Sequence, residues 1–463
     1  MSSNEKALKS GVWYTISNFL LKGIDFITIP IFARLMSKTE YGLYSNYISW
    51  LQIVLVIGSL YLFPSLYSAR YDYENKIENY IRTILLIGST AALIEMIFVI
   101  IFSSYFESLF STNCKFILLM FVYAMVRPAF EVFLVTERIK YNYKKSIGVS
   151  AIAAVSSISI SLLLVLLFED KYQARILGTY IPLVFLCALL YIHYMRNSSQ
   201  FEQECGKYAL KIGLPYVPHA LAMIVLSSTD RIMITHYCGA SDTALYSLAY
   251  TCALGVTVLW SSVNTAFAPW LGEKIHNHEY VLIHDFSSKY VFVVAVPVVG
   301  LILLAPEILF VLGGNQYVDA KFVIPPIMAG CFIQFIYSMY VDIEQFLKKT
   351  GGMAIASVLG ALLNLGLNYV FIPIYGYTAA AYTTLCGYLF LLIIHYFLVS
   401  NLEMTHIYNK KTIICSLLFM LIISVITLYL YSYNILRYAI VGVYLILFVL
   451  IFNRFNVKAM LRK

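Results

Sequence analysis

The chain alternates long apolar runs with short polar connections from one end to the other. An apolar run of about 20 residues is long enough to cross a lipid bilayer as a helix. Fourteen runs meet this description, and no strand-like alternation competes with them. They cover residues 11–33, 41–66, 80–106, 114–136, 146–168, 173–195, 212–236, 243–269, 289–311, 322–343, 353–373, 376–400, 412–431 and 434–452. We therefore predict an all-α polytopic membrane protein with about 14 transmembrane helices.

The first run carries polar residues in its middle. Asn18, Lys22 and Asp25 are four and three residues apart, so they share one face of a helix whose other face is apolar. A charge at the bilayer centre costs roughly 2.5–3.5 kcal/mol on insertion scales. This face indicates either a helix that lines a protein interior or hydrated cavity, or a Lys–Asp pair that neutralises itself and packs helices together.

The third and fourth runs also contain charged residues. Arg127 and Glu131 are four residues apart, with Pro128 between them. They form either an ion pair on one helix face or a pocket in which Arg127 holds a phosphate through two parallel hydrogen bonds. Glu95, near the centre of the third run, is a possible partner for Arg127 or Lys22, or a protonatable site for ion coupling.

The seventh run combines prolines with ionisable residues. Pro215 and Pro218 near its start free backbone carbonyls and allow a bend. His219 and Asp230 are eleven residues apart and share a face. His219 is either a packing histidine or a cavity residue. For Asp230 and Arg231 we expect function or pairing between helices, because lipid exposure of such groups is rare.

The tenth and eleventh runs each carry a polar stripe at helical spacing. The tenth has Gln334, Ser338, Asp342 and Gln345, and the eleventh has Ser357, Ala361, Asn364 and Asn368. Such stripes favour a central hydrated cleft, although small and amide residues also join helices to one another. Asp342 is a second candidate for ion coupling.

Composition agrees with the pattern. The 463 residues are 61% hydrophobic and 12% charged, whereas soluble domains are about 45–50% apolar and about 25% charged. The eight cysteines show no metal-binding or disulfide spacing and read as small apolar residues. His276, His278 and His284 lie in one polar loop and are interpreted as solvated. We expect no metal site and no other cofactor.

The net charge of +8 reflects topology. Most Lys and Arg residues lie in the N-terminal segment and in every second loop. Few lie on the opposite side, namely Arg34, Lys38, Lys115, Lys171, Arg175, Lys321 and Arg437. By the positive-inside rule, both termini face the cytoplasm and the number of spans is even. The basic excess therefore predicts no nucleic-acid partner.

An internal repeat appears at an offset of about 202 residues. Residues 35–47 (LMSKTEYGLYSNY) align with residues 237–250 (YCGASDTALYSLAY) through a shared Leu-Tyr-Ser and an acidic residue before it. The repeat predicts an N-terminal lobe over residues 1–200 (spans 1–6), a C-terminal lobe over 201–402 (spans 7–12), and two added spans in 403–463. Transporters are often built from such repeats, with the substrate bound near the midplane.

Three stretches, residues 13–45, 214–250 and 371–388, resemble the Wzx-type flippases of the polysaccharide transporter family, within the multidrug/oligosaccharidyl-lipid/polysaccharide (MOP) exporter superfamily. The resemblance covers essentially the whole chain. It implies a V-shaped pair of lobes that rock between inward-open and outward-open states in a bacterial cytoplasmic membrane. The implied substrate is an undecaprenyl-diphosphate-linked oligosaccharide repeat unit for O-antigen, capsule or another surface polysaccharide.

The resemblance also implies roles for individual residues. Family members hold the sugar–diphosphate head in a cationic central cavity, and the matching positions here are Lys22, Arg127 and Arg231. Their acidic neighbours, Asp25, Glu131 and Asp230, would be partners or coupling groups. Because carboxylates match these bases nearly one for one, the cavity need not be strongly cationic. The polymerase and ligase of the same pathway are implied as possible partners.

Two other classes of function remain open. An ion-coupled exporter of small molecules or drugs from the same superfamily would use acidic residues, but the usual plan there has twelve spans. A membrane glycosyltransferase or polymerase would need a sizeable outer loop, and the outer loops here are short. There is no nucleotide-binding motif, so uphill transport would need the membrane potential, the substrate's gradient or a coupling ion, H⁺ or Na⁺.

Overall fold

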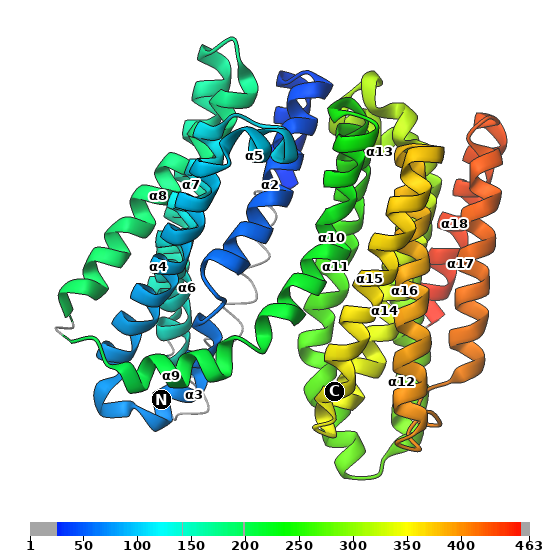
Figure 1. Cartoon of the computed structure of the whole chain (residues 1–463). Coiled ribbons are helices and arrows are strands. Elements are labelled where there is room, and N and C mark those ends of the chain that lie inside the picture. The colour runs from blue at the N-terminus through cyan, green and yellow to red at the C-terminus, as the bar shows by residue number, and fades with distance from the viewer. Residues whose placement is uncertain (1–25, 141, 198–199, 455–463) are drawn as a thin grey trace. The chain divides into compact units, whose positions relative to one another are not determined.

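The computed structural model describes residues 26–140, 142–197 and 200–454, and these residues form helices and no strand. They divide into two compact units (Figure 1). Unit 1 takes the described residues up to Ser247 together with Asn368–Gly376. Unit 2 takes Leu248–Leu367 and the described residues from Tyr377 onward.

Unit 1 begins with a helical segment at Phe26–Leu35. The elements that follow are α2 (Lys38–Gly58), η1 (Phe63–Ser65), α3 (Leu66–Asp72), η2 (Glu74–Lys76), α4 (Ile77–Ile101), α5 (Ser103–Phe110), α6 (Cys114–Ile139), α7 (Tyr143–Leu167), α8 (Lys171–Asn197), α9 (Gln203–Gly213) and α10 (Tyr216–Tyr237). The next helix, α11 (Ala240–His276), starts in unit 1 and continues into unit 2.

Unit 2 continues from α11 to the end of the described chain. Its elements are α12 (Tyr280–Leu303), α13 (Ala305–Gly313), η3 (Asn315–Val323), α14 (Ile324–Phe346), α15 (Thr350–Tyr375), α16 (Tyr377–Ser400), α17 (Lys410–Leu430) and α18 (Asn434–Arg454). The last turns of α15 belong to unit 1.

The helices confirm the all-α polytopic class. Within the described residues, eleven helices are long and apolar enough to cross a membrane, or twelve if α2 and the bent segment after it make one span. The first and last predicted spans are represented by the shorter apolar helices Phe26–Leu35 and Asn434–Ile446. The count of 14 and the division into lobes of six spans remain predictions.

Two predicted spans end earlier than the apolar pattern indicated. The run 80–106 is split between α4, which ends at Ile101, and the short α5. The run 289–311 is split between α12, which ends at Leu303, and α13. Pro306 stands in the first turn of α13, where its missing N–H breaks no helical hydrogen bond. Pro306 therefore accounts for the second of these two breaks, where α13 starts inside a continuous apolar run.

Two glycines in unit 1 allow close contact between helices. A Cβ atom at Gly42 of α2 would lie 1.7 Å from the carbonyl oxygen of Ala240, at the start of α11. A Cβ atom at Gly178 of α8 would lie 2.3 Å from Cα of Ser161 on α7. Real Cβ atoms do not approach other atoms so closely, so a side chain at either position would push the two helices apart.

The start of α2 is fixed by a capping box. The Ser37 hydroxyl accepts a hydrogen bond from the Glu40 N–H, and the Glu40 carboxylate accepts one from the Ser37 N–H. Arg175 of α8 lies nearby and is only 8% exposed, with its guanidinium 3.9 Å from the centre of the Tyr44 ring and 4.1 Å from that of Phe32. Arg175 is thus a core residue, whereas the sequence placed it among loop charges.

The amphipathic helix α9 closes one end of unit 1 and runs across the ends of other helices (Figure 1). Cys205 and Ala209 are buried in a hydrophobic cluster with α3 and α4. Glu202, just before α9, accepts hydrogen bonds from Lys76 at 3.0 Å and from Asn79 at 2.8 Å. The connection between α8 and α10 is therefore attached to unit 1 by apolar and polar contacts.

In unit 2, α14 is the central helix, and most of its residues are buried. The predicted stripe of Gln334, Ser338 and Asp342 forms the less buried side of α14. The predicted stripe of α15 is buried instead, because Ser357, Asn364 and Asn368 are 7% exposed or less. Asn364 donates to Thr384 at 3.3 Å, which favours the alternative that these residues join helices.

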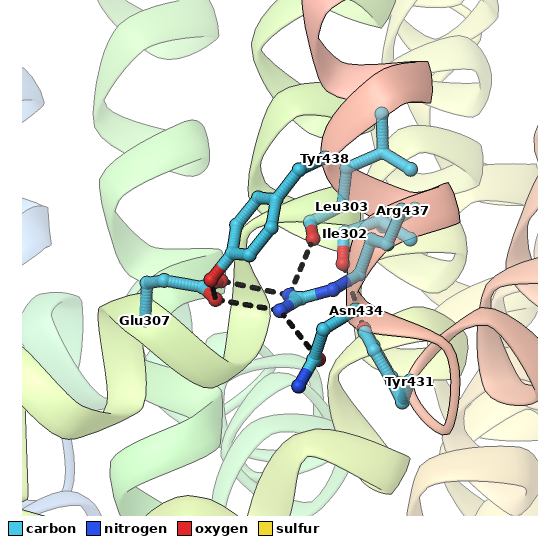
Figure 2. A network of polar contacts seen from close by, with 7 residues as sticks. All are labelled: Ile302, Leu303, Glu307, Tyr431, Asn434, Arg437 and Tyr438. Atoms are coloured by element: carbon cyan, nitrogen blue, oxygen red, sulfur yellow. Dashed lines mark hydrogen bonds and ion pairs between the residues drawn. The ribbon is translucent and has the colours of Figure 1, made fainter.

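The hairpin of α17 and α18 is held to unit 2 by a second buried arginine, Arg437 (Figure 2). Its guanidinium makes two parallel hydrogen bonds to the Glu307 carboxylate of α13, at 2.6 and 2.7 Å. It also donates to the carbonyl of Leu303 and the side chain of Asn434. The Arg437 side chain is only 2% exposed, so it too is not the loop charge that the sequence suggested.

Candidate functional site

The candidate site lies where α2 breaks. The axes of α2 and of the segment Phe63–Asp72 differ by 54°. Between them, Leu60 and Tyr61 have φ angles of 51° and 48°, a left-handed conformation that is uncommon for residues other than glycine. The Ser59 hydroxyl donates to the Leu55 carbonyl at 2.6 Å and accepts from the Tyr61 N–H at 3.3 Å. The break is therefore a defined structure with its own hydrogen bonds.

A pocket of about 360 Å³ opens beside this break. Residues from the end of α2, from the break and η1 that follow it, from α6 and from α10 line it: Gln52, Leu55, Val56, Ser59, Tyr61, Phe63, Arg127, Pro128, Glu131 and Ile224. This volume falls within the range of about 300–1,000 Å³ that is typical of small-molecule sites. All of the lining residues belong to unit 1.

Arg127 and Glu131 bring charge to this pocket. The Arg127 Nε and Nη2 atoms donate to Oε1 of Glu131 at 3.1 and 2.5 Å, and Nη1 donates to the Tyr123 hydroxyl at 2.9 Å. The guanidinium also lies 4.7 Å from the centre of the Phe130 ring. Both charged side chains are 28% exposed. The predicted ion pair is thus formed, and it is accessible at the pocket wall.

The guanidinium has unused binding capacity. An arginine side chain carries five N–H donors, and the described residues use three of those of Arg127. A free fork of N–H groups suits the oxygens of a phosphate or carboxylate. Glu131 keeps the pocket close to neutral when it is empty. The two interpretations drawn from the sequence, ion pair and phosphate site, are therefore compatible in one structure.

Several residues that line the pocket were not among those predicted from the sequence. Gln52 accepts a hydrogen bond from Ser228 of α10 at 2.9 Å, which links α2 to α10 beside the pocket. Ser59 and Tyr61 become lining residues only because α2 breaks. Gly58 and Pro64, which flank the break within an apolar run, are the signal that could have indicated it.

Glu95 lies on α4 beside this region but is not the partner of Arg127. Its Oε2 atom would be 3.4 Å from a Cβ atom at Gly58, so the carboxyl group contacts the end of α2. In the described part of the chain, Arg127 pairs with Glu131 instead. Glu95 remains a prediction for ion coupling.

Asp230 of α10 is fully buried. Its carboxylate accepts hydrogen bonds from the Tyr246 hydroxyl at 2.5 Å and from the Asn368 side chain at 2.6 Å. These contacts join α10, α11 and the end of α15 within unit 1. The structure thus places Asp230 between helices and away from the Arg127 pocket, which favours the pairing interpretation.

The other two predicted residues of α10, Arg231 and His219, are less buried than Asp230. Arg231 is half-buried and donates to the Ser227 carbonyl at 2.8 Å. His219 is half-buried, and its Nδ1 atom is buried without a hydrogen-bond partner among the described residues. Neither residue lines the Arg127 pocket.

The remaining predicted residues add nothing to the described part of this pocket. Asn18, Lys22 and Asp25 fall outside the described residues. Asp342 is in unit 2, where it accepts a hydrogen bond from Asn264 of α11 at 3.3 Å. The structure therefore brings two of the predicted site residues, Arg127 and Glu131, together in one pocket.

These features define a multi-pass helical membrane protein with a charged pocket beside a broken helix. A model of the family described as polysaccharide biosynthesis protein matches residues 7–275. Because the match covers more than half of the chain, the protein belongs to this family. A protein of the Lsg locus of Haemophilus influenzae is 21% identical over 86% of this chain and 100% of its own length.

Solved structures with a similar fold are transport proteins. The lipid II flippase MurJ, in an inward closed conformation, has a TM-score of 0.71 at 15% identity, over 96% of this chain and 100% of its own. An inward-facing multidrug resistance MATE family transporter of the MOP superfamily has a TM-score of 0.55 at 14% identity, over 82% and 98%. At these identities the comparisons establish a fold of the MurJ and MATE type.

Proposed function

We propose that this protein is a flippase that moves an undecaprenyl-diphosphate-linked oligosaccharide repeat unit across the bacterial cytoplasmic membrane by alternating access. Membership of the polysaccharide biosynthesis family supports the oligosaccharide, and a fold similar to that of a lipid II flippase supports a lipid-linked cargo. In this proposal both termini face the cytoplasm, and the product serves the synthesis of O-antigen, capsule or another surface polysaccharide.

The observation that carries the proposal is the Arg127 pocket. An arginine within an apolar helix is costly unless it pairs or serves a ligand, and Arg127 combines one carboxylate partner with unused N–H donors. In the proposed cycle, Arg127 replaces water around the diphosphate, while the pocket accepts the first sugar. The isoprenoid tail stays in the lipid, since its burial in a charged pocket would be unfavourable.

A genetic experiment with a lipid measurement tests the substrate. The gene is deleted, and undecaprenyl-linked intermediates are extracted and identified by mass spectrometry. Accumulation of a complete lipid-linked repeat unit is the expected result and would identify the glycan. An unchanged lipid pool, combined with altered sensitivity to cationic drugs, would overturn the proposal in favour of an exporter.

Two matched substitutions in the pocket separate the flippase from the exporter. A flippase for an anionic diphosphate requires Arg127, so Arg127→Ala abolishes complementation while Glu131→Gln retains part of it. An exporter of cations shows the reverse order, because the carboxylate would then hold the cargo. Immunoblots of membranes confirm that each variant is present at the wild-type level. The pathway's polymerase and ligase are proposed partners, and a coupling ion is part of the proposal developed next.

A further inference from the structure

A glutamate and a histidine are paired deep inside unit 2. Glu344, in the last turn of α14, and His395, on α16, are in contact through Oε1 and Nδ1 at 2.8 Å. The side chains are 1% and 3% exposed, respectively. The Tyr337 ring stacks on the His395 ring, with centroids 5.5 Å apart and planes within 11°. The sequence analysis did not select either member of this pair.

The second oxygen of Glu344 is unusual. Oε2 is buried and accepts no hydrogen bond from any residue that the structure describes. If Glu344 were ionised, a negatively charged oxygen would be buried without a hydrogen-bond donor, which is costly. If Glu344 were a neutral carboxylic acid, the same oxygen would carry no charge, and leaving it without a donor would cost less. In the described chain, no lysine or arginine forms an ion pair with Glu344.

Other titratable groups lie on α14 and on the elements packed against it. The acidic and basic ones are Asp342 on α14, His284, Asp285 and Lys289 on α12, and Lys410 and Lys411 at the start of α17; the tyrosines include Tyr337 and Tyr340 on α14, Tyr388 and Tyr396 on α16, Tyr290 on α12 and Tyr408 before α17. Asp342 accepts a hydrogen bond from Asn264 of α11, Lys289 is half-buried, and Lys410 and Lys411 are exposed. Asp319 and Lys321 of η3 precede the opposite end of α14. The described surroundings thus supply no buried cation for a lone Glu344 carboxylate.

The number of protons on the pair follows from its burial. With one proton, the pair is neutral overall, either as carboxylic acid and imidazole or as carboxylate and imidazolium. Without that proton it carries one negative charge, and with a second proton one positive charge. A dry site disfavours both charged states, so burial favours the neutral pair over the other two.

We propose that Glu344 and His395 share one proton and form the site at which the transport cycle is coupled to proton movement. The inference rests on the proposed transport function and names H⁺ as the coupling ion. A proton enters from one aqueous phase, converts the pair from a charge of −1 to zero, and permits the closed packing of α14 against α16. It leaves when these helix ends open to water, which restores the charge.

The first experiment measures the proton itself on the purified full-length protein. Infrared difference spectra across a pH titration report the carbonyl stretch of a protonated carboxylic acid. We expect a pH-dependent band that is absent in Glu344→Gln and displaced in His395→Gln. The exposed residues Glu403 and His406 provide matched controls, and Glu403→Gln and His406→Gln should leave the band unchanged. A wild-type spectrum with neither a pH-dependent carboxylic acid band nor a pH-dependent imidazole band overturns the proposal without relying on a variant, and so does a band that persists unchanged in Glu344→Gln.

The second experiment measures coupling. Wild-type protein in liposomes flips a fluorescently labelled undecaprenyl diphosphate monosaccharide, and an imposed pH gradient changes the rate. In Glu344→Gln the rate falls to the value measured without a gradient, while Glu403→Gln keeps the response. An unchanged gradient response in Glu344→Gln overturns the coupling. If the wild-type protein flips nothing but the Glu344-dependent band persists, the proposed substrate fails and the proton site stands.

Discussion

Two arginine–glutamate pairs in this protein have the same chemistry and different architecture. Arg127 and Glu131 lie one turn apart on α6, and each side chain is 28% exposed at the wall of a pocket. Arg437 and Glu307 come from different helices, α18 and α13, and the Arg437 side chain is 2% exposed. The first pair keeps unused N–H donors at a pocket wall, whereas Arg437 donates to four oxygen atoms of three residues.

The difference indicates what each pair contributes. A pair within one helix adds little to tertiary structure, because both partners already move together. A bidentate pair between distant helices fixes their relative position and is strongly destabilised when one partner is removed. The difference agrees with the proposed ligand-binding role of Arg127–Glu131 and favours a structural role for Arg437–Glu307 in the attachment of the α17–α18 hairpin.

Removal of Glu307 should have the largest effect on stability. Glu307→Ala leaves the buried Arg437 without its carboxylate and should lower the free energy of unfolding by about 3 kcal/mol. Thermal unfolding of the detergent-purified protein, followed by size-exclusion chromatography, measures this change. Glu131→Ala is the matched control and should shift unfolding far less. Equal shifts for the two variants would contradict the assigned roles.

Substitution of Arg127 should act on transport rather than on stability. Arg127→Ala removes charge-assisted hydrogen bonds to the cargo, and a loss of about 2 kcal/mol corresponds to roughly 30-fold weaker binding of a diphosphate lipid. Arg127→Lys should also be impaired, since lysine lacks the planar fork. Binding of undecaprenyl diphosphate to the purified variants measures the effect. Wild-type affinity in both variants would remove Arg127 from the site.

A smaller effect is expected at the edge of the Arg437 network. The Tyr431 hydroxyl donates to the Ile302 carbonyl at 2.7 Å, a neutral hydrogen bond between α17 and α12 (Figure 2). Tyr431→Phe should therefore cost about 1 kcal/mol, clearly less than Glu307→Ala. The same thermal assay compares the two variants. A larger loss for Tyr431→Phe would show that the tyrosine, and not the ion pair, attaches the hairpin.

The smallest effect concerns the pair of the exposed Lys76 and the half-buried Glu202 beside α9. Hydrogen bonds from Asn79 and then Lys76 lower the pKa of Glu202. The ionised Glu202 carboxylate therefore contributes its full stabilisation of the folded state at a pH above the ordinary glutamate pKa of about 4.3. This contribution is lost as the pH falls through the lowered pKa of Glu202 in the folded protein. The protection of the α9 amides against hydrogen exchange, taken relative to the intrinsic rate at each pH, should fall over that acidic range and should fall less in Glu202→Gln. The same acid dependence in the variant would exclude Glu202 as its origin.

The sequence predicted the helical class and the Arg127–Glu131 pair because both depend on local spacing. Residues four apart on a helix must be neighbours. Arg437 and Glu307, in contrast, are separated by 130 residues, so their contact depends on how α13 and α18 pack. The partners of Asp230 were missed for the same reason, since Asn368 lies 138 residues away.

The alternation of apolar runs and polar connections also could not predict which basic residues are buried. Arg175 and Arg437 stand within three residues of the start of the runs 173–195 and 434–452 and were counted with the loop charges, but one lies among aromatic rings and the other in an ion pair. The division into lobes of residues 1–200 and 201–402 remains a prediction. The roles of Asn18, Lys22 and Asp25 also stay predictions, since these residues fall outside the described chain.

The backbone at Leu60 and Tyr61 has a consequence for the design of variants. Glycine adopts positive φ without strain, so a glycine at either position would relax the main chain. The protein instead carries two large side chains there: Leu60 packs against the hydrophobic core of unit 1, and Tyr61 lines the Arg127 pocket. Tyr61→Gly would thus remove backbone strain and at the same time take a large side chain from the pocket wall, so the strained backbone is kept together with a narrower pocket.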